Sequence, residues 1–472
     1  MIRRPLRSCG ATAALSVALL LSSCTSATRL DGTQGAGSVH DPLFPALGNG
    51  GYQVGHYGLA LDYDVRGGTL DATADISATA QADLASFQLD LQGMKVHGVR
   101  VDGETAEFSR KGHKLTVRPP ATVKKGATFR TTVEYDGAPE EMTDADGSTE
   151  GWVRTEDGAF VAGQPAGSMT WFPGNNHPGD KAAYDFKITV PDGYTAVANG
   201  ELRGRKSAKG RTTFEWHNAE PMASYLATAT IGKFTVAESR TKSGLPVYTA
   251  VDPAEAEESA GPLGKLDEIL DWSVKRFGPY PFSSAGAIVD HTPERVDWGA
   301  LETQTKPVYA GAPDEGTVVH ETAHQWFGDS VTPKTWKDIW LNEGFAQYAE
   351  WLWEEDKGGR TAQRQFDELY KTAEDDEDDE NIWAFPPGDP GTAENVTGQP
   401  VYKRGAMVLQ QLRKAVGDQD FFAILKDWPA EHRHGNADTQ QFIDFCQDRT
   451  EVDLTDLFDD WLYGDGKPDW EY

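Results

Sequence analysis

The sequence predicts a multidomain fold in which an all-β amino-terminal domain precedes a mainly α-helical domain. The chain has 472 residues, which is too long for one compact core. From about residue 43 to residue 237, apolar residues alternate with small or polar ones, which is the period of half-buried strands. After residue 236 the apolar residues recur at helical spacing, as they do along residues 264–277.

Composition and charge place the chain among soluble globular proteins. Hydrophobic residues make up 38% of the sequence, with 14 Trp, 15 Tyr and 20 Phe, which is not a disordered composition. The 44 basic and 74 acidic residues give a net charge of −30. Nucleic-acid binding needs a basic surface, so no nucleic-acid partner is expected. Nothing in the sequence indicates a subunit interface, and a monomer is the default expectation.

The first 24 residues have the organisation of an export signal. Arg3, Arg4 and Arg7 precede an apolar run, Ala11 to Leu21, that is too short to span a bilayer stably. The run ends in Leu-Ser-Ser-Cys24, which resembles a bacterial lipobox. We therefore expect residues 1–24 to be a lipoprotein signal peptide, with lipid on Cys24 holding the protein at the outer face of the bacterial cell membrane. An ordinary signal peptide with an incidental Cys is the alternative.

The rest of the chain divides by pattern. Residues 25–42 are rich in Gly, Ser and Thr and predict a flexible tether. The β pattern begins with Tyr57, Leu59, Leu61 and Tyr63, and turn signals such as Arg66-Gly-Gly separate its repeats. The sequence thus predicts a β domain over residues 43–238 and a second domain over residues 239–472.

The second domain contains the motif His320-Glu321-x-x-His324. On a helix, residues four apart share one face and lie about 6 Å apart along the axis, so two imidazoles can bind one Zn²⁺ from the same side. Glu321 would project into the same cleft without binding the metal, where it could move protons to and from an activated water. The alternative is an amphipathic helix with two solvated histidines. The apolar neighbours Val318 and Val319 argue against it, because they indicate a buried helix.

Eighteen residues separate His324 from Glu343, which lies in Trp340-Leu-Asn-Glu-Gly-Phe345. Catalytic zinc takes three protein ligands, and two His with one Glu is a known set. Glu343 opens an apolar run that predicts a second helix, and antiparallel packing of the two helices would bring Glu343 beneath the histidines. The alternative for Glu343 is a first-turn carboxylate that complements the helix dipole.

Together these motifs resemble the aminopeptidase N family of zinc metallopeptidases, which are gluzincins with thermolysin-like catalytic domains. The segment Phe172 to Pro178 is similar to one in that family's amino-terminal saddle domain, although Gly174, Asn176 and His177 replace a Cys, an Asp and a Glu. The resemblance covers about residue 43 onwards. It implies a saddle-like β domain followed by a thermolysin-like zinc peptidase domain.

The resemblance also implies how a substrate is held. Trp298-Gly-Ala-Leu-Glu302 is similar to the family's Gly-Ala-Met-Glu-Asn signature. It implies that an edge strand with Gly299 and Ala300 binds the substrate backbone. It further implies that Glu302, helped by Gln164, binds the free α-ammonium. A carboxylate at a fixed distance from the attacked carbonyl would direct cleavage to the first peptide bond.

The segment Tyr402-Lys-Arg-Gly-Ala406 resembles the family's Tyr-x-Lys-Gly-Ala segment. It implies that Tyr402 donates a hydrogen bond to the oxyanion formed during hydrolysis. The sequence therefore predicts an aminopeptidase with one Zn²⁺ per chain and peptides as substrates. A zinc endopeptidase on the same scaffold and a non-catalytic peptide-binding lipoprotein are the alternatives. Whether the acidic run at residues 374–380 binds a cation, and whether Asp338 supports a metal ligand or a helix terminus, stay open.

Overall fold

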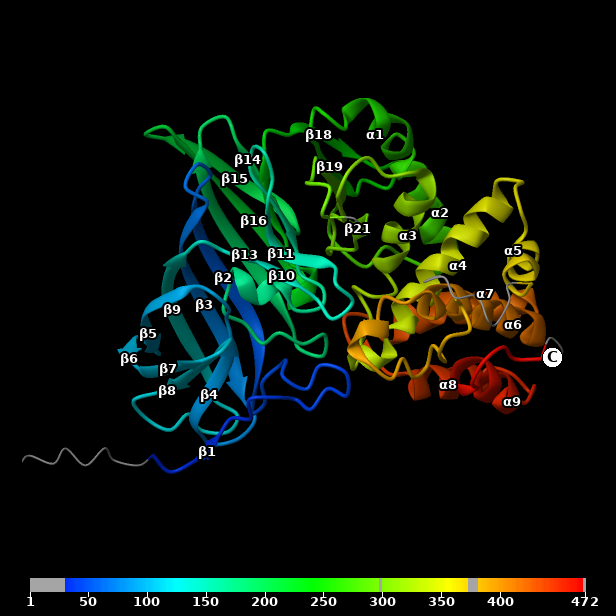
Figure 1. The fold of residues 1–472 in the computed structure, drawn as a ribbon, viewed down its shortest axis with the longest axis horizontal. Helices are drawn as coiled ribbons and strands as arrows, with labels where there is room; N and C mark the ends of the chain where they lie inside the picture. The colour runs from blue at the N-terminus through cyan, green and yellow to red at the C-terminus, as the bar shows by residue number, and fades with distance from the viewer. Residues whose placement is uncertain (1–29, 297–298, 372–380, 470–472) are drawn as a thin grey trace, which may run out of the picture.

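The structure, a computed structural model, describes residues 30–296, 299–371 and 381–469. A β-rich half and a mainly helical half lie side by side along the long axis (Figure 1). The predicted signal peptide, its Cys24 and the acidic run at residues 374–380 lie outside the described residues. Within the described part of the chain, no helix is both long enough and apolar enough to span a bilayer.

Three sheets build the β-rich half, which confirms the predicted all-β domain. The largest has eight strands in the order β15 (Glu201–Ala208), β16 (Arg211–Ala223), β13 (Lys181–Pro191), β2 (Tyr52–Asp64), β3 (Thr69–Ala80), β9 (Thr128–Gly137), β5 (Lys95–Val101), β6 (Glu104–Thr105). A second has the order β1 (Thr33–Gln34), β4 (Leu84–Asp90), β8 (Lys114–Arg118), β7 (Glu107–Lys111). The third has the order β10 (Glu141–Thr143), β11 (Thr149–Arg154), β12 (Ala159–Ala162), β17 (Ala229–Gly232), β14 (Thr195–Ala198). The pairs β13–β2 and β1–β4 are parallel, and the other strand pairs of these sheets are antiparallel.

The alternation of the sequence becomes alternation of burial. In β2 the side chains of Tyr57, Leu59, Leu61 and Tyr63 are buried, and the residues between them are exposed or half-buried. A shift of register near Gly55 changes the parity of the strand, so that residues on both sides of the bulge still direct their apolar side chains into the core.

Residues 33–41 do not form the flexible tether that their composition predicts. Strand β1 pairs with β4, and Asp41 is only 2% exposed. The Asp41 carboxylate accepts hydrogen bonds from the backbone N–H groups of Phe44 and Trp336, and one of its oxygens lies 3.1 Å from His177 Nε2. One buried carboxylate thus ties this segment to both halves of the molecule, which composition does not indicate.

The second half is mainly helical, as predicted, and it also contains a smaller sheet. Its strand order is β18 (Thr235–Arg240), β19 (Pro246–Val251), β20 (Ala285–Val289), β22 (Val308–Tyr309), β21 (Ala300–Leu301). The predicted domain boundary at residues 238 and 239 falls inside β18. The helices are α1 (Ala256–Leu263), α2 (Leu266–Phe277), α3 (Glu315–His324), α4 (Trp340–Asp356), α5 (Ala362–Leu369), α6 (Gly405–Val416), α7 (Asp418–Glu431), α8 (Thr439–Gln447) and α9 (Thr455–Phe458). A short parallel pair, β23 (Thr332–Pro333) with β24 (Asn436–Ala437), joins two loops.

Buried polar contacts fix the two halves to each other. Lys181, on β13, is 8% exposed, and its Nζ donates to the carbonyl oxygens of Asp329, Ser330 and Gly435 at 2.8, 2.9 and 3.0 Å. Tyr225 Oη donates to the Gly328 carbonyl at 3.1 Å. Because these donors would be costly to bury without acceptors, the docking of the halves is specific rather than only hydrophobic.

Candidate active site

Helix α3 carries the two histidines of the motif. Asp314 caps its first turn by accepting from the Thr317 backbone N–H at 2.8 Å. Val318 and Val319 are fully buried against the core, which leaves the opposite face of the helix for His320 and His324. The imidazole ring centroids lie 4.7 Å apart. The buried-helix interpretation of this segment is therefore confirmed.

Helix α4 brings Glu343 to the histidines, as the spacing of the motifs predicts. Glu343 lies in the first turn of α4 and is 2% exposed. Its Oε2 is 3.4 Å from His320 Nε2 and 3.2 Å from His324 Nε2. Ligand atoms about 2.0–2.2 Å from one tetrahedral Zn²⁺ lie roughly 3.3–3.5 Å apart, so these three atoms fit a zinc ion.

The outer nitrogens of both rings are also held in place. His320 Nδ1 is 2.7 Å from Glu350 Oε1, and His324 Nδ1 is 3.0 Å from the Phe327 carbonyl oxygen. Both partners are acceptors, so each Nδ1 carries the proton and each Nε2 directs its lone pair into the site. The donor set therefore fits Zn²⁺ in chemistry as well as in distance.

Sequence reasoning missed Glu350, although a signal was present. Glu350 lies seven residues after Glu343 on a helix, so the two share one face, and it interrupts an otherwise apolar run. Asp338, the residue considered for this supporting role, lies elsewhere. Its Oδ1 accepts from the backbone N–H and hydroxyl of Thr439 at the start of α8.

Two glycines bring the segment that carries Tyr402 close to helix α4. A Cβ added to Gly344 on α4 would lie 2.9 Å from the Gly405 carbonyl carbon, so the two backbones are in direct contact. Tyr402 lies just before Gly405, in the π-helical turn η5 (Pro400–Arg404). Its ring stacks on His320 at a centroid distance of 6.1 Å and an interplanar angle of 20°.

Arg404 fixes this turn from the other side. It is fully buried, and its guanidinium donates to the carbonyl oxygens of Asp460, Trp461, Gly464 and Gly466 at 3.0, 3.0, 2.7 and 2.8 Å. The segment 460–466 therefore helps to determine the position of η5, because four of its backbone carbonyl groups accept hydrogen bonds from this one side chain.

Glu302 and Gln164 meet in the same site from the two halves of the molecule. Glu302 follows strand β21 and is 3% exposed. The carboxylate offers only acceptors, so the amide nitrogen of Gln164 faces it, at 2.9 Å from Oε1 and 3.3 Å from Oε2. Strand β21, which contains Ala300 and follows Gly299, is the last strand in its sheet, as expected for an edge strand.

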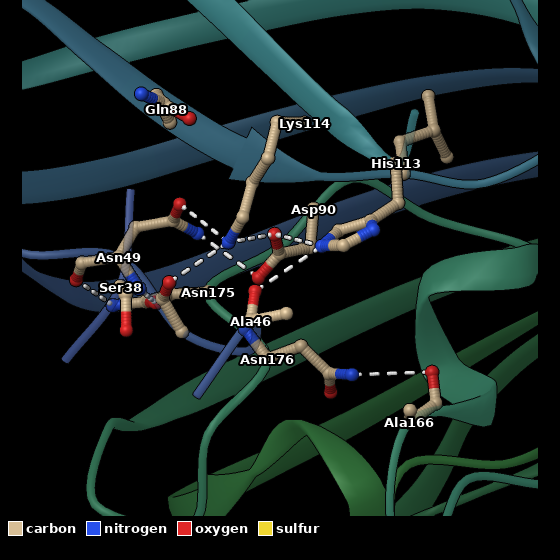
Figure 2. A network of polar contacts seen from close by, with 12 residues as sticks. Ser38, Ala46, Asn49, Gln88, Asp90, His113, Lys114, Ala166, Asn175 and Asn176 are labelled. Carbon is tan, nitrogen blue, oxygen red and sulfur yellow. Dashed lines mark hydrogen bonds and ion pairs between the residues drawn. The ribbon is translucent and has the colours of Figure 1, made fainter. Parts of the chain in front are cut away.

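Buried polar side chains hold the loop that carries Gln164. Glu150 Oε2 accepts from the backbone N–H groups of Ala166 and Gly167 at 3.0 and 2.6 Å. Asn176 Nδ2 donates to the Ala166 carbonyl at 3.1 Å, while its backbone N–H donates to Asp90 Oδ2 at 3.4 Å (Figure 2). The altered residues of the Phe172–Pro178 segment thus position the site through a network that sequence reasoning did not foresee.

One cavity of about 500 Å³ collects the predicted site residues that the structure describes. They are Gln164, Gly299, Ala300, Glu302, His320, Glu321, His324, Glu343 and Tyr402. The loop between β10 and β11 contributes Asp146, whose Oδ2 accepts from Thr397 Oγ1 at 2.5 Å. Both halves of the molecule therefore form the walls of the cavity.

Burial governs the ionisation of the groups in this cavity. It raises the pKa of Glu302, and Glu343 and Glu321 raise it further, while His324 opposes the rise. Burial likewise raises the pKa of Glu321, against the effect of the two histidines. The pKa of Tyr402 is raised well above its ordinary value by burial, so its hydroxyl stays protonated.

Family models match both halves of the chain. The peptidase M1 N-terminal domain matches residues 53–226, and the peptidase family M1 domain matches residues 305–461. The chain is 26% identical over 381 residues to glutamyl aminopeptidase of Mus musculus, which covers 74% of this chain and 39% of the relative. It is 27% identical over 398 residues to aminopeptidase B of Homo sapiens, covering 77% of this chain and 58% of the relative. The chain thus spans roughly two fifths to three fifths of the length of these relatives.

The fold is similar to solved structures over almost its whole length. The M1 zinc metallopeptidase from Deinococcus radiodurans is 26% identical, with a TM-score of 0.84, covering 92% of this chain and 98% of that one. A mutant of that metallopeptidase has been solved with a Tyr-Ser-Ala substrate, again with a TM-score of 0.84, covering 92% of this chain and 99% of that one at 26% identity.

Proposed function

The chain belongs to peptidase family M1, and from that premise we propose that it is a zinc-dependent aminopeptidase that removes the first residue of peptides. The observation that carries the proposal is the position of Glu302 and Gln164 in the same cavity as the two histidines and Glu343. A binding group for an ammonium beside a metal site favours substrates with a free amino terminus.

The family implies one catalytic Zn²⁺, which His320, His324 and Glu343 would hold. When bound, Zn²⁺ supplies a Lewis acid that polarises the peptide carbonyl and acidifies a water. Glu350 and the Phe327 carbonyl keep both histidines in the tautomer that a metal requires.

Glu321 is proposed as the group that transfers protons. It is 5% exposed, lines the cavity, and its Oε2 has no hydrogen-bond partner among the described residues. A raised pKa makes its carboxylate a better acceptor for a proton from the attacking water. The carboxylic acid then donates that proton to the departing amine.

Tyr402 is proposed to stabilise the negative charge that forms on the carbonyl oxygen. Its hydroxyl stays protonated, and its ring is parallel to His320 at the edge of the metal site. A neutral phenol can donate one hydrogen bond to the oxyanion, and a donor already in place costs no reorganisation during the reaction.

Glu302 and Gln164 are proposed to bind the α-ammonium of the substrate. The Glu302 carboxylate and the Gln164 amide oxygen are both acceptors, and the amide can present that oxygen once an ammonium replaces its contact with Glu302. Gly299 and Ala300, at the edge of the sheet, supply backbone groups to the substrate chain. Occupancy of this ammonium site places the first peptide bond at the metal.

The proposal can be tested by measuring hydrolysis of a panel of aminoacyl-p-nitroanilides and of the amino-acetylated version of each. Every substrate is assayed with and without a zinc chelator. Chelator-sensitive cleavage of the free-amine substrates alone is the expected result. Equal cleavage of blocked peptides would indicate a zinc endopeptidase. Zinc bound without cleavage of peptides of several lengths would indicate a peptide-binding protein.

We further propose that the protein is a monomeric lipoprotein at the outer face of the cell membrane, anchored through Cys24. The charge pattern of residues 1–24 and the Leu-Ser-Ser-Cys24 motif support the anchor. Mass spectrometry of the mature amino terminus tests it, and Cys24→Ala should release the protein from the membrane fraction.

A further inference from the structure

Three carboxylates outside the active site meet where the two halves of the molecule join. Asp252 directly follows β19, and Asp290 directly follows β20. These strands are parallel neighbours whose last residues, Val251 and Val289, are paired, so the two aspartates emerge side by side. Asp157 approaches them from the turn between β11 and β12, in the β-rich half. One oxygen from each carboxylate lies within 4.8 Å of the others.

Asp290 is the unusual member of this cluster. Its side chain is fully buried, and neither of its carboxylate oxygens has a hydrogen-bond partner among the described residues. Burial raises its pKa well above the ordinary value, and Asp157 and Asp252 raise it further. A buried carboxylate without a partner costs several kcal/mol. Such a group therefore requires a proton or a cation.

The neighbouring residues do not provide that cation. No ion pair among the described residues joins Asp157, Asp252 or Asp290 to a lysine, an arginine or a histidine. The adjacent His291 directs its Nδ1 to Glu255 at 2.5 Å. Asp157 and Asp252 each use one oxygen to accept a backbone N–H, from Lys233 at 2.9 Å and from Ala254 at 2.7 Å. These bonds orient the carboxylates and leave their other oxygens for a ligand.

We propose that Asp157, Asp252 and Asp290 bind one divalent cation, Ca²⁺, at the junction of the two halves of the molecule. The ligand atoms are all oxygens, which hard cations such as Ca²⁺ prefer. Zinc sites, in contrast, usually include nitrogen or sulfur ligands. Calcium bonds of about 2.3–2.6 Å allow oxygens up to about 5 Å apart around one ion. Ca²⁺ also accepts irregular geometry, whereas Mg²⁺ requires near-octahedral ligands at about 2.1 Å.

The cation would stabilise the segments that lead into the active site. Strand β12 runs from the Asp157 turn toward Gln164, and the chain after Asp290 leads to strand β21 and Glu302. A cation that holds the Asp157 turn and Asp290 would restrain Gln164 and Glu302, the two residues proposed to bind the substrate ammonium. This consequence rests on the proposed function, whereas binding of the cation does not.

The test uses the full, zinc-loaded protein, cleared of weakly bound divalent ions on a chelating resin and checked for retained zinc. Isothermal calorimetry with CaCl₂, MgCl₂ and ZnCl₂ measures binding, and thermal unfolding measures stability without reference to activity. We expect one Ca²⁺ per chain, Mg²⁺ binding at least 10-fold weaker, and a melting temperature raised by a few degrees at 100 times the Kd. KM for a free-amine substrate should rise at least threefold when Ca²⁺ is removed.

Variants assign the binding to these residues. Asp290→Asn should abolish calcium binding and the thermal shift. If that variant does not fold, Asp157→Asn is tested in its place. Its amide oxygen can still accept the hydrogen bond from the Lys233 backbone N–H, but the negative charge of the ligand is lost. Ca²⁺ should then bind at least 10-fold more weakly. Asp71→Asn, an exposed change on β3, is the matched control and should bind Ca²⁺ like the wild type.

Three results would overturn the proposal. Wild-type protein that takes up no Ca²⁺, with Asp290→Asn equally stable, would identify Asp290 as a neutral buried acid. Calcium binding that survives all the cluster variants would place the ion elsewhere. A second zinc ion that Asp290→Asn displaces would exclude calcium as the natural ligand. Loss of peptidase activity with intact calcium binding would instead count against the proposed function alone.

Discussion

Replacing Glu302 by glutamine removes one negative charge from the active site while keeping the shape of the side chain. Glu302 is 3% exposed, and the Gln164 amide lies 2.9 Å from its Oε1. A glutamine at this position can still accept that hydrogen bond, so local structure should survive. What the variant loses is the negative charge, on a nearly buried side chain, that would balance a bound ammonium.

The size of the loss follows from burial. A hydrogen bond to a charged group contributes about 1.5–3 kcal/mol, and breaking a buried ion pair costs about 3–5 kcal/mol. We take about 3 kcal/mol, the value common to both ranges, which corresponds to a fall of about 150-fold in kcat/KM. The assay is hydrolysis of one aminoacyl-p-nitroanilide and its acetylated form by zinc-loaded protein. Glu107→Gln, an exposed change on β7, is the control.

The substitution should lower kcat/KM for the free-amine substrate while the zinc content stays at the wild-type level. The acetylated substrate carries no charge for Glu302 to bind and, because the wild type is not expected to cleave it, serves as the blank. A fall of less than threefold in kcat/KM, at unchanged zinc content, would refute the assignment of the ammonium to Glu302. A fall in zinc content that matches the fall in activity would show that the substitution disturbs the metal site instead.

Three further changes test other parts of the structure. Glu350→Gln weakens the acceptor 2.7 Å from His320 Nδ1, so zinc affinity should fall about 10- to 100-fold in competition with a calibrated chelator. Gly344→Ala inserts a methyl group 2.9 Å from the Gly405 backbone, so α4 and the start of α6, which directly follows η5, must move apart. We expect the free energy of unfolding to fall by about 1–3 kcal/mol, and kcat to fall with it. Lys306→Met removes an amine whose pKa burial lowers to about 7. Above pH 7 the unfolded chain holds one more proton at this lysine than the folded chain, so raising the pH favours folding. Urea unfolding between pH 7 and pH 9 should show the wild type gaining up to about 1.4 kcal/mol per pH unit over the variant. An unchanged competition curve, an unaltered kcat or a constant stability difference would contradict these expectations in turn.

Features that depend on neighbours in the sequence were predictable. Alternation predicted β2, because a strand repeats every two residues. The spacing of His320 and His324 predicted their shared face, because a helix repeats every 3.6 residues. Glu343 followed from the ligand number of zinc, and the placement of Tyr402 in the cavity agrees with the family resemblance. The anchor at Cys24 stays a prediction.

Features that depend on the docking of distant segments were not predictable. Asp41 was assigned to a tether by composition, yet it pairs with His177 and with the Trp336 backbone. Asp290 lies beside Asp252 only because of the register of two parallel strands, which no local pattern reveals. The sequence indicated that Glu350 shares a helical face with Glu343. It did not indicate that this face packs against α3, so the contact of Glu350 with His320 could not be predicted.

The contacts of Arg404 also constrain when the proposed active site can form during synthesis. A ribosome extends the chain from the amino terminus, so both histidines, Glu343 and Tyr402 are synthesised before the four carbonyl groups that hold the Tyr402 turn. Until residue 466 is free to fold, that turn lacks its support. A nascent chain therefore contains the three residues proposed to bind zinc before the turn that carries Tyr402 is fixed in place.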